Sequence, residues 1–247
     1  MNKIVINNNN LVLGDVGDIV LGDTINFTKS GSYFLEIVDS DKFDFEIVIG
    51  DNVFVKLFIW SKGNSIDSNI KYVLGDNSNL EIEKFSCNKS VNENVMIFLN
   101  GIGSKCIYKL SGISRGIEEY NMKIYHNNKM VNSYISNKFI GYDKANISFD
   151  IDSILDKGNV DVIMDQVTKI LTFGDVKARV CPNMYIDEDS VTAKHGTVIS
   201  DISYDDIFYL MSRGIFEEDA IRLLSIGFIM SNMSGDFDVR DMIMECI

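Results

Sequence analysis

Short apolar runs, each closed by glycine, asparagine or aspartate, follow one another along most of the chain. The runs are rich in Val, Ile, Phe and Tyr and have the length of single strands. Examples span residues 43–49, 53–60, 70–74, 95–99, 147–151 and 160–164. A helical spacing of apolar positions is hard to find before residue 198. This pattern predicts that the first part of the chain is all-β.

An apolar residue followed by Gly-Asp recurs between these runs. The recurrences are Gly14-Asp15, Gly22-Asp23, Gly50-Asp51, Gly75-Asp76 and Gly174-Asp175. Glycine supplies positive φ at little cost, and the aspartate carboxylate can cap a turn. Gly50 and Gly75 lie 25 residues apart, which is the scale of one solenoid coil. A sandwich with Gly-Asp hairpins would give a similar pattern, so the spacing favours a β-helix without excluding the sandwich.

The pattern changes after Gly196. Ser203 stands three residues before Asp206, as in a helix start where the hydroxyl accepts free backbone amides. Apolar positions then follow at helical spacing. Gly214 occupies the left-handed position expected just past a helix end. We therefore predict a first helix between Ser203 and Gly214.

A second helix is predicted to open with the acids at 217–219, which suit the positive end of the helix dipole. Ser234-Gly235-Asp236 interrupts it, and one more short helix is predicted between 239 and 246. The chain is therefore predicted to comprise a β core, residues 1–197, and a C-terminal helical domain, residues 198–247.

The formal net charge of −13 repels phosphate backbones and anionic lipid, so nucleic acid and membrane surfaces are poor candidate partners. The acidity is equally consistent with solubility alone. No run approaches the roughly 18–20 consecutive apolar residues that a membrane span requires. The start of the chain lacks the apolar region of a signal peptide. We therefore expect a cytoplasmic protein.

The four cysteines are scattered and include no CxxC pair. A zinc knuckle or a self-contained four-cysteine iron–sulfur site normally shows a close pair. A disulfide framework is not expected without an export signal. Cys87, Cys106 and Cys246 have no nearby Cys or His in the sequence, and we expect them to be buried as small apolar side chains.

Two blocks near the C-terminus form a specific pattern. The first is Ser-Arg-Gly-Ile-Phe-Glu-Glu-Asp-Ala-Ile-Arg-Leu-Leu at 212–224, followed by Gly227-Phe228. The second has a proline, an apolar strand and an acidic turn at 182–191, then His-Gly-Thr-Val at 195–198. The order and spacing of both blocks resemble those of the SufB/SufD family, the scaffolds of the SUF system for iron–sulfur cluster assembly. The chain resembles a short, SufD-like member of this family.

The resemblance implies a mainly β fold, with a right-handed parallel β-helix-like core and a C-terminal helical domain. In the family that domain binds SufC, an ABC-type ATPase, and the β-helices of two subunits pair. The implied partners are therefore a SufC-like ABC ATPase and a second SufB/SufD-like subunit, in a homodimer or a heterodimer. The sequence has no P-loop, so we expect this chain to bind no nucleotide itself.

An aromatic face on the first predicted helix could dock into a groove of another protein. Packing against the β core is the alternative, and it must hold for about half of the apolar residues of this region. The residues that we assign to the partner-binding side are Tyr204, Phe208, Tyr209, Arg213 and Arg222.

His195 is the main candidate metal ligand, because histidine binds metals and exchanges protons near neutral pH. The resemblance puts the matching position at a subunit interface where an iron–sulfur cluster assembles transiently. Gly196 follows it, as in SufD-type sequences, and Thr168 stands near the position of the SufB-type cysteine. Cys181 is a second candidate cluster ligand through its soft thiolate, with core packing as the favoured alternative. A structural role is the alternative for His195, and we expect His126 to be a partly exposed polar residue.

We expect no catalytic residues, since no Ser/His/Asp order, GxGxxG or HExxH motif occurs. A carbohydrate-active β-helix would need paired carboxylates, and predicts a surface groove with two facing acids. The adjacent acids at 187–189 would instead point to different sides of a strand or into water. The main alternative to a cluster scaffold is a divergent interaction subunit of an ABC ATPase complex that handles no iron.

Overall fold

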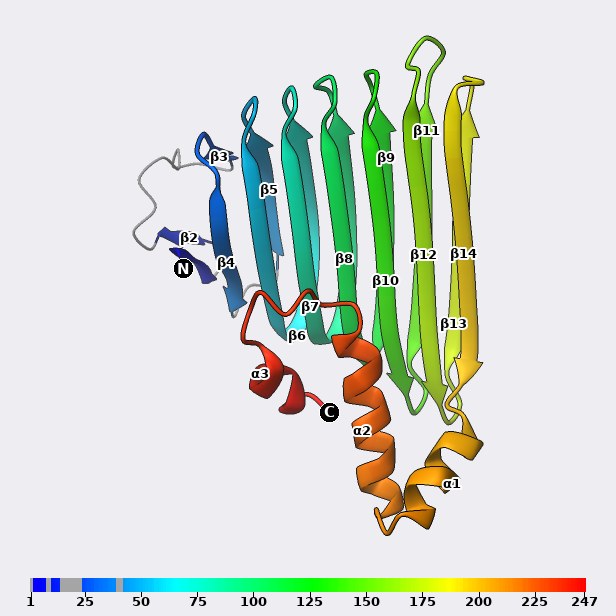
Figure 1. Ribbon diagram of the computed structural model, residues 1–247. Helices are drawn as coiled ribbons and strands as arrows, with labels where there is room; N and C mark the ends of the chain where they lie inside the picture. The colour runs from blue at the N-terminus through cyan, green and yellow to red at the C-terminus, as the bar shows by residue number, and fades with distance from the viewer. Residues whose placement is uncertain (1, 8–9, 14–23, 39–41) are drawn as a thin grey trace.

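The computed structural model describes residues 2–7, 10–13, 24–38 and 42–247, and strands dominate this part of the chain up to Asp201 (Figure 1). The strands are β1 (Asn2–Asn7), β2 (Asn10–Leu13), β3 (Thr24–Phe27), β4 (Gly31–Val38), β5 (Lys42–Ile49), β6 (Phe54–Leu74), β7 (Asn79–Leu99), β8 (Lys105–Ser114), β9 (Ile117–His126), β10 (Asn132–Tyr142), β11 (Asn146–Leu155), β12 (Val162–Phe173), β13 (Lys177–Ile186) and β14 (Val191–Asp201). The helices are α1 (Tyr204–Ser212), α2 (Glu217–Met230) and α3 (Arg240–Met244).

The strands form two facing layers of one parallel β-helix. The first layer has the order β14-β12-β10-β8-β7-β6-β4-β1-β2, and the second has the order β3-β5-β6-β7-β9-β11-β13. All pairs are parallel except β1 with β2. The long strands β6 and β7 bend from one layer into the other. The predicted mainly β, parallel β-helix fold is therefore confirmed, and the sandwich alternative is wrong.

Each coil adds one strand to both layers in register. Phe54 pairs with Asn79, Asn79 with Lys105, and Lys105 with Asn132, so these coils take 25 to 27 residues. The next coil is longer, because Asn132 pairs with Ile163, 31 residues on. Inward-facing apolar side chains alternate with outward-facing residues along the strands and fill the space between the layers. Stacking in register explains why the apolar pattern repeats at the spacing of the Gly-Asp corners.

The Gly-Asp corners stack on one another through their aspartates. Asp51 Oδ1 accepts a hydrogen bond from the backbone N–H of Asp76 at 2.8 Å, and Asp76 Oδ1 accepts one from Ile102 N–H at 2.8 Å. The expectation that Gly50 and Gly75 supply positive φ is wrong, because Asn52 (φ 57°) and Asn77 (φ 49°) take the left-handed conformation instead. Gly174 does have φ +79°, as expected. The corners at Gly14-Asp15 and Gly22-Asp23 lie outside the described residues.

The C-terminal segment covers part of the outer face of the first layer. Four residues of this segment are buried there: Ile229 near the end of α2, Phe237 and Val239 before α3, and Ile243 within α3. The strands contribute Phe34, Phe58, Trp60, Phe85, Ile113 and Ile140 to the same apolar cluster. The β core is thus buried on both sides where this segment lies.

The predicted helix ends agree with the structure. Ser203 Oγ accepts a hydrogen bond from Asp206 N–H at 3.2 Å, and Gly214 has φ +87°. The expected domain division at residue 198 falls within β14, which continues to Asp201. In the described part of the chain no helix has the length and apolar character to cross a bilayer.

Candidate functional site

The hairpin of α1 and the first half of α2 projects beyond the β-helix at the end where β14 finishes (Figure 1). Ile207 is the buried residue of α1. Large apolar side chains are exposed on this hairpin, with Phe216 at 80%, Tyr204 at 71% and Phe208 at 64%. We call the exposed set the hairpin surface; it comprises Tyr204, Phe208, Tyr209, Met211, Phe216 and Leu223.

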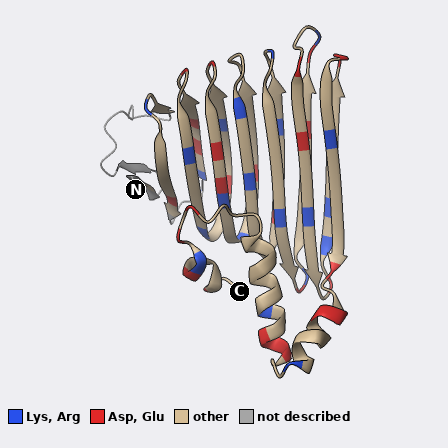
Figure 2. Cartoon of the chain, viewed as in Figure 1, with Lys and Arg blue, Asp and Glu red and all other residues tan. Residues whose placement is uncertain are grey.

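Charges surround the hairpin surface. Asp205 and Asp206 lie in the first turn of α1, and residues 217–219 form an acidic first turn of α2 (Figure 2). The Arg213 guanidinium lies 5.3 Å from the centre of the Tyr209 ring and donates a hydrogen bond to its hydroxyl at 3.5 Å. This cation–π contact orders the Tyr209 side chain at the surface.

Arg222 faces the C-terminal segment. Its Nη2 donates a hydrogen bond to the carbonyl of Met244 in α3 at 3.2 Å. Tyr204, Phe208 and Tyr209 are exposed as the sequence predicted, and Arg213 is exposed beside them. Arg222, which the sequence assigned to the partner-binding side, thus hydrogen-bonds the C-terminal segment of its own chain.

The last coil of the β-helix is open. In the described sheet, β14 pairs with β12 and β13 pairs with β11, and the other edge of both strands carries no partner strand. Apolar side chains are exposed on these strands, among them Tyr185, Ile186, Val198 and Ile199. Natural proteins usually protect long edges with charge, proline or a cover, because free backbone groups pair with other strands. This edge carries Arg179, Pro182 and Lys194, which are protective features of that kind. The exposed apolar side chains beside them nevertheless give it the character of an association surface.

His195 lies on β14 at this open end, and its side chain belongs to the set that faces the interior of the β-helix. It is in register with Gln166 of β12, whose side-chain amide donates a hydrogen bond to Ser153 Oγ across the interior at 2.6 Å. No further coil covers His195 in the described residues, and its side chain is exposed. Thr168, which stands near the position of the SufB-type cysteine, is buried and accepts a hydrogen bond from Asn137 at 3.1 Å.

Cys181 lies on β13, and its side chain belongs to the outward-facing set of that strand. It is in register with Asp150, which projects outward and forms an ion pair with Arg179 at 2.7 Å. Cys181 therefore projects from the outer face, whereas His195 projects toward the interior of the open coil. A single chain does not bring these two candidate ligands together. Among the described residues, no three His, Cys, Asp or Glu side chains gather closely enough to hold a metal ion.

His126 is buried, so the expectation of a partly exposed residue is wrong. Its Nε2 lies 2.8 Å from Ser133 Oγ and its Nδ1 lies 3.1 Å from the carbonyl of Ile154. Burial lowers the pKa of His126 to about 4. Both partners come from the next strands, β10 and β11, so the residues directly beside His126 in the sequence do not indicate its burial.

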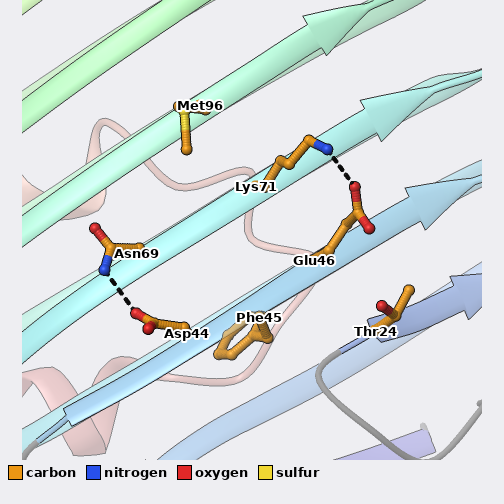
Figure 3. Close-up of a pocket in the computed structure, with 7 residues that line it drawn as sticks. All are labelled: Thr24, Asp44, Phe45, Glu46, Asn69, Lys71 and Met96. Carbon is orange, nitrogen blue, oxygen red and sulfur yellow. Dashed lines mark hydrogen bonds and ion pairs between the residues drawn. The ribbon is translucent and has the colours of Figure 1, made fainter.

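A hollow of about 380 Å³ lies on the second layer near the N-terminal coils (Figure 3). Asp44 and Glu46 project from the same strand, β5, rather than facing each other across the hollow. Asp44 accepts a hydrogen bond from Asn69 at 2.6 Å, and Glu46 pairs with Lys71 at 2.7 Å. These two carboxylates do not have the facing arrangement that a carbohydrate-active enzyme needs.

Sequence reasoning missed a pair of cysteines. Cys106 and Cys246 are buried as expected, whereas Cys87 is only partly buried. Cys87 on β7 packs against the apolar cluster that contains Cys246, and the two thiols interact. No signal in the sequence indicates this pair, because its members come from distant segments.

Comparison with known proteins places this fold in a family. Residues 45–228 match the model of the SufBD core domain of the SUF system for FeS cluster assembly. The chain belongs to the SufBD family. The proposed resemblance to SufB and SufD is thereby confirmed, together with the link to iron–sulfur cluster assembly.

Individual relatives agree with this assignment. The iron–sulfur cluster assembly protein SufD of Bacillus subtilis (strain 168) is 32% identical over 135 residues, which are 53% of this chain and 31% of the relative. SufB of the same organism is 42% identical over 48 residues, which are 19% of this chain and 10% of SufB. The SufBD family protein Rv1461 of Mycobacterium tuberculosis is also 42% identical over 48 residues, 19% of this chain and 6% of the relative. The matched segments thus cover less than a third of the length of each of these three relatives.

Proposed function

We propose that this chain is a scaffold subunit of a SUF-type iron–sulfur cluster assembly complex, and that it docks a SufC-like ABC ATPase through the hairpin surface. The observation that carries the proposal is the exposure of aromatic and aliphatic side chains on α1 and the start of α2. A patch of this kind on a helical hairpin is typical of a helix-in-groove contact. The sequence has no P-loop, so nucleotide hydrolysis would be the partner's task.

The end of α2 is firmly attached to the β-helix, which would let movement of the hairpin reach the strands. Tyr142 of β10 hydrogen-bonds Ser225 of α2 at 3.2 Å. Asn232, just past α2, donates to Ser111 Oγ at 3.0 Å and accepts a hydrogen bond from Ser136 Oγ at 2.6 Å. Closure of two ATPase subunits would pull on the hairpins and, through these contacts, on the β-helix.

The open edge of β13 and β14 is the surface through which a second SufB/SufD-like subunit would pair. The cluster is the cargo of this assembly and would form at the interface, with His195 as a ligand from this chain. Because His195 and Cys181 project in different directions, the remaining ligands would come from the partner. Cys181 could contribute only from the outer face. A cytoplasmic location remains part of this proposal.

We expect loss of ATPase binding when the hairpin surface is truncated to alanine. Tyr204→Ala/Phe208→Ala removes two exposed rings, and should weaken binding of a SufC-like ATPase by about tenfold or more because aromatic anchors dominate such contacts. Co-purification and titration of the two proteins measure this. Removal of everything after Ser200 is a poorer test, since it would uncover Phe58 and Phe85.

Phe54→Ala is the matched control for the hairpin variant. Phe54 has a similar exposure of 56% and lies at the start of β6, whereas α1 follows the end of β14. It should leave ATPase binding unchanged. Equal loss in the control and the hairpin variant, or full binding by the hairpin variant, would remove the hairpin from the docking account.

His195→Ala should reduce cluster formation. Anaerobic reconstitution with iron and sulfide, in the presence of the partner subunit, is followed by the visible absorbance of the cluster. We expect this absorbance to fall in His195→Ala and to persist in Lys194→Ala, where the altered side chain projects to the other side of the same strand. Absence of a cluster with every partner combination would instead favour the interaction subunit that handles no iron.

A further inference from the structure

The C-terminal segment, residues 237–247, is held against the outer face of the first layer beside Cys87. Phe237, Val239, Ile243 and Cys246 are buried in the apolar cluster there, and Cys87 packs against the same cluster. We call residues 237–247 the tail. Its last residues are those closest to Cys87.

Neighbouring coils hold the tail on both sides of Cys87. Lys62 is the ladder partner of Cys87 on the preceding coil, and its Nζ lies 3.5 Å from Glu245 Oε2. Arg115, just past β8 of the next coil, donates a hydrogen bond to the carbonyl of Cys246 at 3.0 Å. These contacts hold Glu245 and Cys246 beside the coils on either side of Cys87.

The two thiols interact with each other. Both thiols belong to the same apolar cluster, and interaction with the Cys246 thiol, with the cations of Lys62 and Arg115, lowers the pKa of Cys87 to about 7 despite burial. The same interaction, together with burial, raises the pKa of Cys246. Cys87 is therefore partly ionised to the thiolate at neutral pH, whereas Cys246 remains protonated.

We propose that Cys87 and Cys246 form a redox-active pair that closes to a disulfide and fastens the tail to the β-helix. The oxidant is a low-molecular-weight disulfide such as oxidised glutathione. Cys87 is only partly buried, and a cavity of about 640 Å³ lies beside the tail, lined among others by Tyr142, Glu245 and Ile247.

The chemistry proceeds in two exchange steps. The Cys87 thiolate attacks one sulfur of the small disulfide, a mixed disulfide forms, and one small thiolate leaves. The negative charge on Cys87 is then gone, which removes the repulsion that opposed ionisation of Cys246. Cys246 loses its proton to solvent and attacks the Cys87 sulfur, and the second small thiol leaves. The protein loses two electrons and two protons, and the small disulfide becomes two thiols.

Closure would change how the helical region is attached. In the reduced chain the end of the tail is held by apolar packing, the Lys62–Glu245 ion pair and the Arg115 hydrogen bond. Arg222 of α2 also binds the tail through the carbonyl of Met244. A disulfide at Cys246 would therefore anchor the tail, and with it the contact to α2, to the β7 strand.

The test is oxidation of the full chain by oxidised glutathione, followed by thiol counting and mass spectrometry of peptides without reduction. We expect the number of free thiols to fall from four to two, with a Cys87–Cys246 linkage and no bound glutathione. Limited proteolysis should then cut the tail more slowly than in the reduced chain. Reduction by dithiothreitol should restore four thiols and the original cleavage rate.

Single substitutions make the result specific. In Cys246→Ser, glutathione should remain on Cys87 because no second thiol expels it, and in Cys87→Ser no linkage should form. Cys181→Ser is the matched control and should form the Cys87–Cys246 linkage normally. Four remaining thiols in the oxidised chain, glutathione persisting on Cys87 of the unsubstituted chain, or a linked tail that is cut at an unchanged rate would overturn the proposal.

Discussion

Glu93→Ala should lower the free energy of unfolding by about 3–5 kcal/mol, the usual cost of breaking a buried ion pair from one side. The Glu93 and Lys84 side chains are 1% and 2% exposed and pair with each other inside the β-helix. Glu93 Oε2 also accepts a hydrogen bond from Ser68 at 3.3 Å. The substitution leaves the Lys84 ammonium buried without its carboxylate, and urea denaturation measures the loss.

Two controls separate this effect from a general intolerance of mutation. Lys84→Met/Glu93→Leu removes both charges at similar volume and should recover most of the lost stability, because the interior then contains no unpaired ion. Arg179→Ala breaks the exposed pair with Asp150, whose side chains are 59% and 40% exposed, and should cost less than about 1 kcal/mol. A double variant as unstable as Glu93→Ala, or a Glu93→Ala variant as stable as Arg179→Ala, would contradict the assignment.

Gly101→Ala should lower the free energy of unfolding by about 3 kcal/mol or more, at or above the top of the range of about 1–3 kcal/mol that is usual for overpacking. A Cβ at Gly101 would lie 2.0 Å from the carbonyl carbon of Gly75 and 2.1 Å from the backbone nitrogen of Asp76. Both atoms belong to the backbone of the coil below, so no side chain can move aside. Relief requires the corners to separate, which would break the hydrogen bond between Asp76 and Ile102. Thermal or urea denaturation reports the effect.

Gly196→Ala is the control for this substitution. No atom lies within 4 Å of the position that its Cβ would occupy, so the change should stay within about 0.5 kcal/mol of the original stability. If Gly101→Ala lowered the free energy of unfolding as little as Gly196→Ala, the corners could not be stacked as closely as described.

Features that depend on neighbours in the sequence were predictable. The Ser203 cap and the Gly214 helix end follow from local hydrogen bonding and from glycine's access to positive φ. The alternation of apolar residues and the spacing of Gly50 and Gly75 indicated strands stacked in coils, because each coil repeats the same turn.

Features that depend on contacts between different strands and coils were not predictable. The buried state of His126 arises from Ser133 and Ile154, which come from other strands. The Cys87–Cys246 pair requires the tail to return over β7. At the corners, the carbonyl group of Gly75 excludes a Cβ at Gly101, while Asn77 takes the left-handed conformation that glycine was expected to take.

The inward or outward direction of a candidate ligand also required the fold. His195 occurs in the block that resembles the family and Cys181 directly precedes that block, but the sequence spacing does not tell toward which side of its strand each side chain projects. Register with Gln166 and Asp150 assigns them to different rows. One residue inserted before either would exchange these directions, because side chains alternate along a strand.

Hydrogen–deuterium exchange of the chain with and without a SufC-like ATPase tests the docking account most directly. We expect amide exchange to slow in peptides covering residues 204–223, and to remain unchanged in the turn at 127–130, which lies at the other end of the coils (Figure 1). Slower exchange at that distant turn or along β3 and β5, with no change at 204–223, would contradict docking through the hairpin.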